Sequence, residues 1–175
     1  MHAPDTGTLG DAPDGRRALT FERSFAHPPE KVWRALTEPE HLRGWFAQYL
    51  DYERSRLDLR GEGAELEFVP APGPEQPPVE KGRVVRSAPP GLLEYTWGAE
   101  TLRWELAPDG DGGCLLTFTN LFPDPSFAPF NALGWHSGLD RLTALLDGDD
   151  PAAIRLEADE AAAGALLHHY EEAFG

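Results

Sequence analysis

Side chains that commonly do chemistry are sparse and scattered in this sequence. None of its six histidines has a second His, Cys or carboxylate at a spacing typical of zinc ligands. No Ser-His-Asp order, Gly-x-Ser-x-Gly elbow or phosphate-binding glycine loop can be found. The single cysteine, Cys114, has no neighbour in the sequence that would activate its thiol. We therefore predict no catalytic residue, no metal and no cofactor.

His136 is the one histidine with a suggestive position, because it directly follows Trp135 in an apolar helical pattern. An imidazole placed there could act as an acid, a base or a hydrogen-bond donor. A surface position is the plainer interpretation. We expect it for the remaining histidines, which are His2, His27, His41, His168 and His169.

Length and charge narrow the class of protein. A chain of 175 residues is long enough for one well-buried core. The chain has 15 Lys and Arg against 30 Asp and Glu, which gives a formal charge of −15. Such a charge repels nucleic acid and anionic membranes. No stretch has the roughly 20 apolar residues of a membrane span, and no apolar signal core opens the chain. We expect a cytoplasmic protein with no nucleic-acid or membrane partner and a disordered leader over residues 1–18.

The elements that would position any site begin with a strand. Residues 19–26 alternate apolar and polar side chains, as a strand with one covered face does. A short helix should follow from Pro29 to about Thr37, since apolar residues then recur at helical spacing behind a proline. Pro39 should open a second short helix that ends near Trp45.

The rest of the chain predicts an antiparallel meander followed by helices. Period-two patterns around residues 64–68, 93–97 and 102–106 lead to a glycine-rich turn and a last long strand over 114–122. A leucine stripe predicts a long helix over about 131–147, with Arg141 among the polar residues on its wet side. A second stripe predicts an extra helix over 159–174. The fold class is thus α+β, with about six to seven strands closed over the long helix.

Three sequence motifs resemble those of a known protein family. They are Phe21–Trp45 (FERSFAHPPEKVWRALTEPEHLRGW), Gly134–Gly148 (GWHSGLDRLTALLDG) and Tyr170–Gly175 (YEEAFG). With them the chain resembles the homologues of the activator of heat-shock ATPase, in the START-like or SRPBCC superfamily. The resemblance implies a helix-grip domain over 19–148, in which the long helix packs across the concave face of the sheet. Residues 149–175 would form a tail with a docked helix.

The resemblance also implies a deep cavity between sheet and helix, used across the superfamily for apolar molecules. Ordinary core packing is the alternative for each residue taken singly, because aromatic side chains at strand or helix spacing usually lie in a core. The candidates to line the cavity are Phe46, Tyr49, Phe68, Trp97, Trp104, Phe118, Phe130, Trp135, Leu139 and Leu142. The possible polar contacts are Tyr95, Arg103, Glu105 and His136.

The leading functional hypothesis is binding of a hydrophobic small molecule such as a lipid, a polyketide or an antibiotic. The domain would carry, sequester or sense the molecule, or protect its host from a toxic natural product. A co-chaperone that stimulates a heat-shock ATPase is an alternative that the family name suggests. A cyclase or dehydratase acting on polyketides is another, although no residue pair favours an enzyme. We expect a monomer or a weak homodimer.

Overall fold

One antiparallel sheet organises the protein. The structure is a computed structural model that describes residues 6–75, 77–154 and 160–175. Seven strands follow the order β1-β2-β7-β6-β5-β4-β3 across the described sheet. Their bounds are β1 Thr8–Asp11, β2 Arg17–Phe25, β3 Glu65–Phe68, β4 Glu80–Ala88, β5 Leu92–Trp97, β6 Glu100–Pro108 and β7 Cys114–Phe122.

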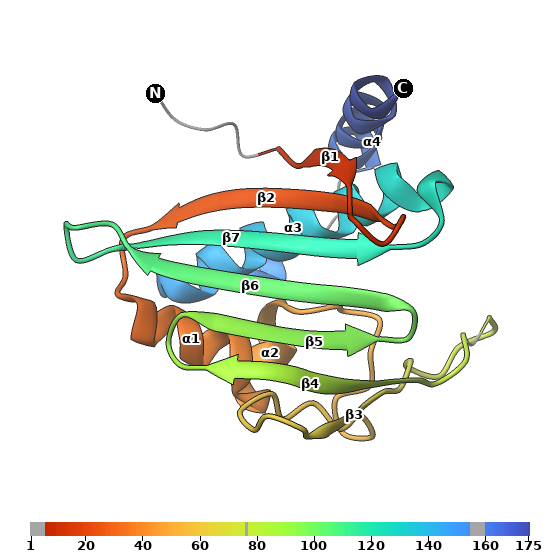
Figure 1. The fold of residues 1–175 in the computed structure, drawn as a ribbon. Coiled ribbons are helices and arrows are strands. Elements are labelled where there is room, and N and C mark those ends of the chain that lie inside the picture. The colour runs from red at the N-terminus through yellow and green to blue at the C-terminus, as the bar shows by residue number, and fades with distance from the viewer. Residues whose placement is uncertain (1–5, 76, 155–159) are drawn as a thin grey trace.

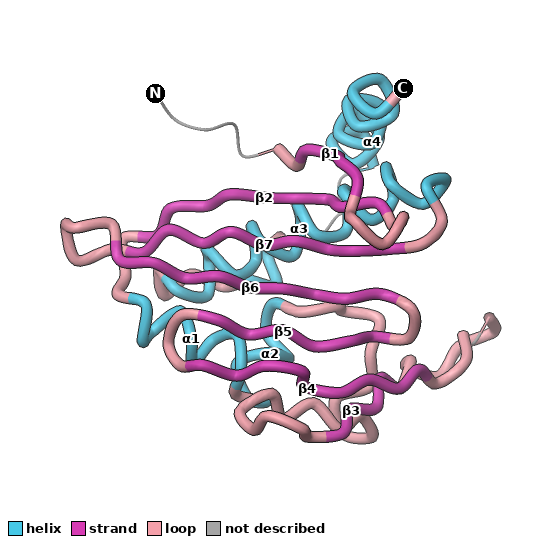
Figure 2. The backbone as a smooth tube through the Cα atoms, viewed as in Figure 1, coloured by secondary structure: helices cyan, strands magenta, loops and turns pink. Residues whose placement is uncertain are grey.

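Helices cover one face of this sheet. They are α1 Pro29–Thr37, α2 Pro39–Trp45, α3 Ala128–Leu146 and α4 Glu160–Phe174, with single 3₁₀ turns η1 Pro125–Phe127 and η2 Pro151–Ala153. α1, α2 and α3 lie together behind the sheet (Figure 1), and α4 stands beyond the β1 edge. Figure 2 shows the same division between a strand layer and a helix layer. The predicted α+β helix-grip fold is confirmed.

Alternating burial along the strands explains why the sheet has a covered face. In β7, Leu116 and Phe118 are fully buried, whereas Leu115 between the turn and these residues is 40% exposed. α3 covers that face with Leu139 and Leu142, both fully buried. Strand pleat and helix stripe therefore meet in one core.

The prediction of a disordered leader over residues 1–18 is wrong for its described part. Thr8–Asp11 forms β1, which pairs with β2 from Thr8↔Thr20 to Asp11↔Arg17. β2 itself begins at Arg17, inside the predicted leader. The pairing uses backbone groups, and only Leu9 of β1 is partly buried. The sequence of this edge strand therefore shows no apolar alternation that would predict it. Residues 1–5 lie outside the described residues.

β4 is a second strand that the apolar pattern did not indicate. Of its residues Glu80–Ala88, only Val84 is fully buried, and its apolar neighbour Val85 is 44% exposed, so the strand shows no apolar alternation. The main chain still pairs with both β3 and β5, with a register shift between Val84 and Arg86. Backbone pairing, not side-chain periodicity, holds this strand in the sheet.

The tail helix α4 docks through Tyr170, which is fully buried. Its hydroxyl accepts a hydrogen bond from the Gly7 N–H (2.9 Å) and shares a second with His136 Nδ1 (2.8 Å). One phenol therefore links α4 to α3 and to the start of β1. A docked C-terminal helix is observed, although residues 155–159 of the predicted tail lie outside the described residues.

Replacing Tyr170 with phenylalanine should loosen this junction. The ring would still fill its site, but the Gly7 N–H and the His136 nitrogen would each lose a buried partner, at a cost of about 1–3 kcal/mol in the free energy of unfolding. We expect a lower melting temperature and faster amide hydrogen exchange in α4 and β1 than in β6. Unchanged exchange in both segments would contradict this role.

Candidate functional site

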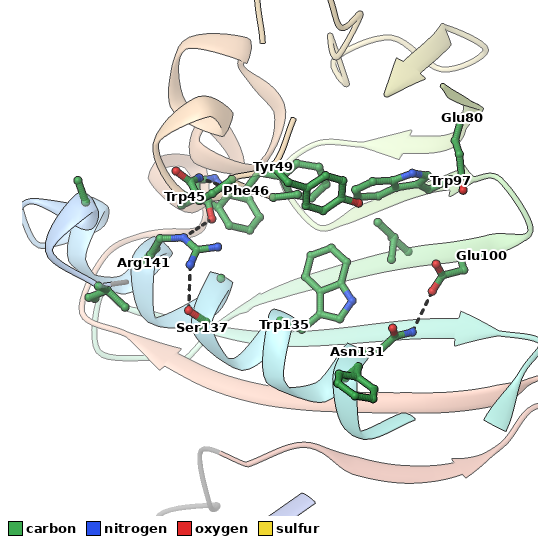
Figure 3. Close-up of a pocket in the computed structure, with 18 residues that line it drawn as sticks. Trp45, Phe46, Tyr49, Glu80, Trp97, Glu100, Asn131, Trp135, Ser137 and Arg141 are labelled. Atoms are coloured by element: carbon green, nitrogen blue, oxygen red, sulfur yellow. Dashed lines mark hydrogen bonds between the residues drawn. The ribbon is translucent and has the colours of Figure 1, made fainter. Parts of the chain in front are cut away.

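A cavity of about 590 Å³ lies between α3, the loop after α2 and the β5–β6 end of the sheet. Figure 3 shows its side chains converging from both layers. The residues that line it are Trp45, Phe46, Ala47, Gln48, Tyr49, Glu80, Trp97, Glu100, Leu102, Phe130, Asn131, Gly134, Trp135, Ser137, Gly138, Arg141, Ala152 and Ile154. The volume falls within the roughly 300–1,000 Å³ typical of small-molecule sites.

Aromatic rings form the walls of this cavity. The ring of Phe46 lies 5.5 Å from Trp97 and 5.7 Å from Trp135 between centroids, so the three enclose one space. Trp97 is fixed from behind by Phe68, stacked at 4.2 Å, and Trp135 by Phe118 at 4.7 Å. The rings are held by core contacts, and a ligand would meet pre-arranged π faces.

The mouth of the cavity also carries aromatic side chains. Tyr49 and Phe130 line the cavity and are 56% and 60% exposed, so the cavity reaches the molecular surface beside them. The Tyr49 ring lies 6.2 Å from that of Trp97. Large exposed apolar side chains next to an apolar cavity are typical of a ligand entrance.

Two glycines on α3 make room for the cavity. Gly134 and Gly138 lie one helical turn apart and both line it. A Cβ at Gly134 would meet nothing within 4 Å, and one at Gly138 would make ordinary contacts of 3.8 and 3.9 Å. Packing therefore does not require glycine at either position. A glycine inside a helix costs about 1 kcal/mol relative to alanine, so the open space has a stability cost.

One end of the cavity is cationic. Arg141 donates from Nε to the Trp45 carbonyl (3.0 Å) and from a terminal nitrogen to Ser137 Oγ (2.9 Å). These bonds fix the guanidinium against α2 and its own helix, where the residue is only 9% exposed. The prediction that Arg141 lies on the wet side of the helix is wrong. Arg141 faces α2, and the sequence pattern did not predict that α2 packs against this side of α3.

The opposite end is acidic. The Glu100 carboxylate accepts hydrogen bonds at one oxygen, Oε1, from the side-chain amides of Asn120 and Asn131, both at 3.1 Å. Burial raises the pKa of Glu100, the two amides lower it in part, and the charge of Glu80 raises it further. Figure 3 shows Glu80 and Glu100 beside Trp97, away from Arg141. The cavity is thus apolar in the middle and oppositely charged at its two ends.

Half of the predicted cavity residues line the observed cavity. These are Phe46, Tyr49, Trp97, Phe130 and Trp135. The others, Phe68, Trp104, Phe118, Leu139 and Leu142, are fully buried in the core behind it. Trp97 and Trp135 share the inward face of β5 and α3 with buried residues such as Tyr95 and Leu139, and depth alone separates them from these core residues.

The predicted polar contacts lie elsewhere. Tyr95 is buried and accepts a hydrogen bond from Trp104 Nε1 (3.2 Å), which occupies it within the core. Arg103 and Glu105 pair with each other at 3.3 Å on the outward parity of β6. His136 contacts Tyr170 at the α3–α4 junction. The prediction of these four as cavity contacts is therefore wrong: the inward parity of β6 belongs to Glu100, Leu102 and Trp104, Tyr95 lies deeper in the core, and His136 faces α4.

Sequence reasoning missed the polar groups of the cavity. Glu100 shares the parity of Leu102 and Trp104, and that alternation was the signal that could have found it. Arg141 and Ser137 share a helix face with Gly138, a signal that the leucine stripe obscured. Ala152 and Ile154 could not have been found, since they reach the cavity only through the path of the chain after α3.

Within residues 6–75, 77–154 and 160–175, no group of three or more His, Cys, Asp and Glu side chains is arranged to hold a metal ion. No helix in the same described segments is long and apolar enough to cross a membrane.

The sheet and the long helix across it define a helix-grip fold. A family model described as "Activator of Hsp90 ATPase homolog 1-like protein" matches residues 26–147, and the chain belongs to that family. The resemblance inferred from the sequence motifs is confirmed. No curated protein matches the sequence.

Solved structures show the same fold at low sequence identity. CalU16 from Micromonospora echinospora aligns with a TM-score of 0.70 and 22% identity, covering 98% of this chain and 99% of that one. The protein of unknown function EF2215 from Enterococcus faecalis gives 0.70 and 22%, covering 95% and 88%. NE0264 from Nitrosomonas europaea gives 0.60 and 26%, covering 75% and 94%.

Proposed function

We propose that this protein binds a hydrophobic small molecule in the cavity between α3 and the sheet. The observation that carries the proposal is an aromatic-walled space of about 590 Å³ for which α3 keeps two glycines, Gly134 and Gly138. A domain selected for stability alone would gain by filling such a space. Binding would serve transport, sequestration, sensing or protection from a toxic natural product.

Polar groups at the ends of the cavity support selective binding. A ligand lying along Phe46 and Trp135 would reach Arg141 with one end and Glu100 with the other. Apolar walls supply affinity, whereas a few fixed polar groups supply orientation and specificity. The membership in a superfamily whose fold is used for ligand binding agrees with this reading.

A thermal-shift screen tests the proposal directly. The purified protein would be heated with lipids, flavonoids, polyketides and aromatic amines. A ligand at about 100 times its dissociation constant adds about 2.7 kcal/mol, and for a chain of this size each kcal/mol raises the melting temperature by about 2–4 °C. We expect at least one chemical class to stabilise the protein and to quench tryptophan fluorescence, since Trp97 and Trp135 line the cavity. Failure of every class would count against small-molecule binding and favour a protein partner.

A further inference from the structure

The acidic end of the cavity has features that bear on the class of ligand. Among the described residues, neither Glu80 nor Glu100 forms a salt bridge, although both line the cavity. Glu80 is exposed and Glu100 is half-buried, and a half-buried carboxylate without a cation loses hydration that only hydrogen bonds repay. The Glu100 carboxylate has two such bonds, from Asn120 and Asn131.

Those two amides also orient the carboxylate. Both donate to Oε1, and no hydrogen bond from the described residues reaches Oε2. Asn131 donates in addition to Asn120 Oδ1 (3.2 Å), so the three side chains form one fixed network. A carboxylate held at one oxygen leaves the other to accept a charge-assisted hydrogen bond from a donor inside the cavity.

Aromatic faces surround the same end. Trp97 lies beside Glu80 and Glu100 (Figure 3), and Tyr49 packs near Trp97. Partial burial, and then the negative charges of Glu80 and Glu100, raise the pKa of Tyr49, in agreement with its place at this end of the cavity. Aromatic rings together with carboxylates are the combination that recognises ammonium groups, through cation–π attraction and ion pairing.

We propose that the cavity selects apolar ligands that carry a protonated amine or a quaternary ammonium group, bound between Glu100, Glu80 and the Trp97 face. The inference rests on the proposed ligand-binding function and names the ligand class. Arg141 fixes the polarity of the bound molecule, because its charge at the far end disfavours a cation there. The apolar body of the ligand lies along Phe46 and Trp135.

Three matched probes test this selection: biphenyl-4-ylmethylamine, biphenyl-4-ylmethanol and biphenyl-4-carboxylate. They share a rigid apolar body and differ in charge, and an alkyl amine stays protonated near neutral pH. By isothermal titration calorimetry we expect the amine to bind about tenfold or more tightly than the alcohol, and the carboxylate to bind most weakly. Equal binding of amine and alcohol, or tightest binding of the carboxylate, would overturn the inference.

Glu100→Gln is the decisive variant. Glutamine keeps an oxygen that can accept from both asparagines but removes the charge, so we expect the amine to lose most of its advantage over the alcohol, with Glu80 and Trp97 retaining the rest. Because burial raises the pKa of Glu100, its charged form is disfavoured in the folded state. The variant should therefore melt at the same temperature as the parent or higher near neutral pH.

Glu105→Gln is the matched control, because it removes the same charge from the outward parity of the same strand. It should keep the preference for the amine, which separates a local effect from attraction to the overall charge of −15. An undiminished preference for the amine in Glu100→Gln would refute the role of this carboxylate. Alcohol binding without an amine preference refutes the inference alone, whereas failure of all three probes to bind counts against the cavity proposal as well.

Discussion

Filling the α3 face of the cavity with leucine at Gly134 and Gly138 should abolish ligand binding and leave the protein folded. Both positions line the cavity, and neither has a neighbour that excludes a Cβ. The two side chains would occupy the space against Phe46 and Trp135 where we place the ligand. We expect an affinity loss of about 100-fold or more, equal to about 2.7 kcal/mol, measured by calorimetry with whichever ligand the screen identifies.

The stability of this double variant should not fall. Leucine is a better helix former than glycine by nearly 1 kcal/mol per position, and burying its side chain in apolar surroundings is favourable. The melting temperature is expected to equal or exceed that of the parent. A variant that loses binding while gaining stability would separate the function of the cavity from the integrity of the fold.

Gly164→Leu provides the control for this experiment. Gly164 also lies inside a helix, α4, with nothing within 4 Å of an added Cβ, but it does not line the cavity. The substitution should therefore change helix propensity and leave affinity unaltered. Gly138→Ala, whose Cβ makes ordinary contacts, should give an intermediate loss. Parental affinity in the double variant would show that the ligand binds outside the cavity.

Much of the fold could be predicted because the sheet has one covered face. Wherever that face is buried, the sequence alternates, as in β5 and β7, and both strands were predicted close to their observed bounds. The edge strand β1 and the mostly exposed strand β4 were not predicted, since backbone pairing leaves no mark on side-chain periodicity. Apolar alternation indicates that one face of a strand is buried, so it does not predict strands that pair through the backbone without burying side chains.

The candidate site was harder to predict, because periodicity gives the face of a residue but not its depth. Trp97 and Trp104 both occupy the inward parity of their strands. Trp97 lies at the end of β5 and lines the cavity, whereas Trp104 lies in the middle of β6 under α2. What distinguishes them is the position of the helices over the sheet, which depends on contacts such as Arg141 with Trp45 that only the tertiary structure supplies.

Because Trp104 is buried more deeply than Trp97, replacing Trp104 with alanine should mainly lower stability, whereas replacing Trp97 should mainly weaken binding. Trp104 is 1% exposed, stacks on Phe118 at 4.0 Å, contacts Trp45 at 5.5 Å and donates to Tyr95. Trp104→Ala should lower the free energy of unfolding by about 3–5 kcal/mol. That loss corresponds to a fall of about 6–20 °C in the melting temperature. Denaturant titration would measure the loss.

Trp97→Ala should instead act mainly on binding. Its ring is only partly buried, so we expect a stability cost of about 1–2 kcal/mol. The ligand, however, loses one aromatic wall and the π face next to Glu100. Affinity should drop by about tenfold or more in Trp97→Ala, and by less in Trp104→Ala measured well below its melting temperature. If Trp104→Ala weakened binding more than Trp97→Ala at equal folded fraction, the ligand would lie in the core region behind the cavity. The acidic end would then have no part in recognition.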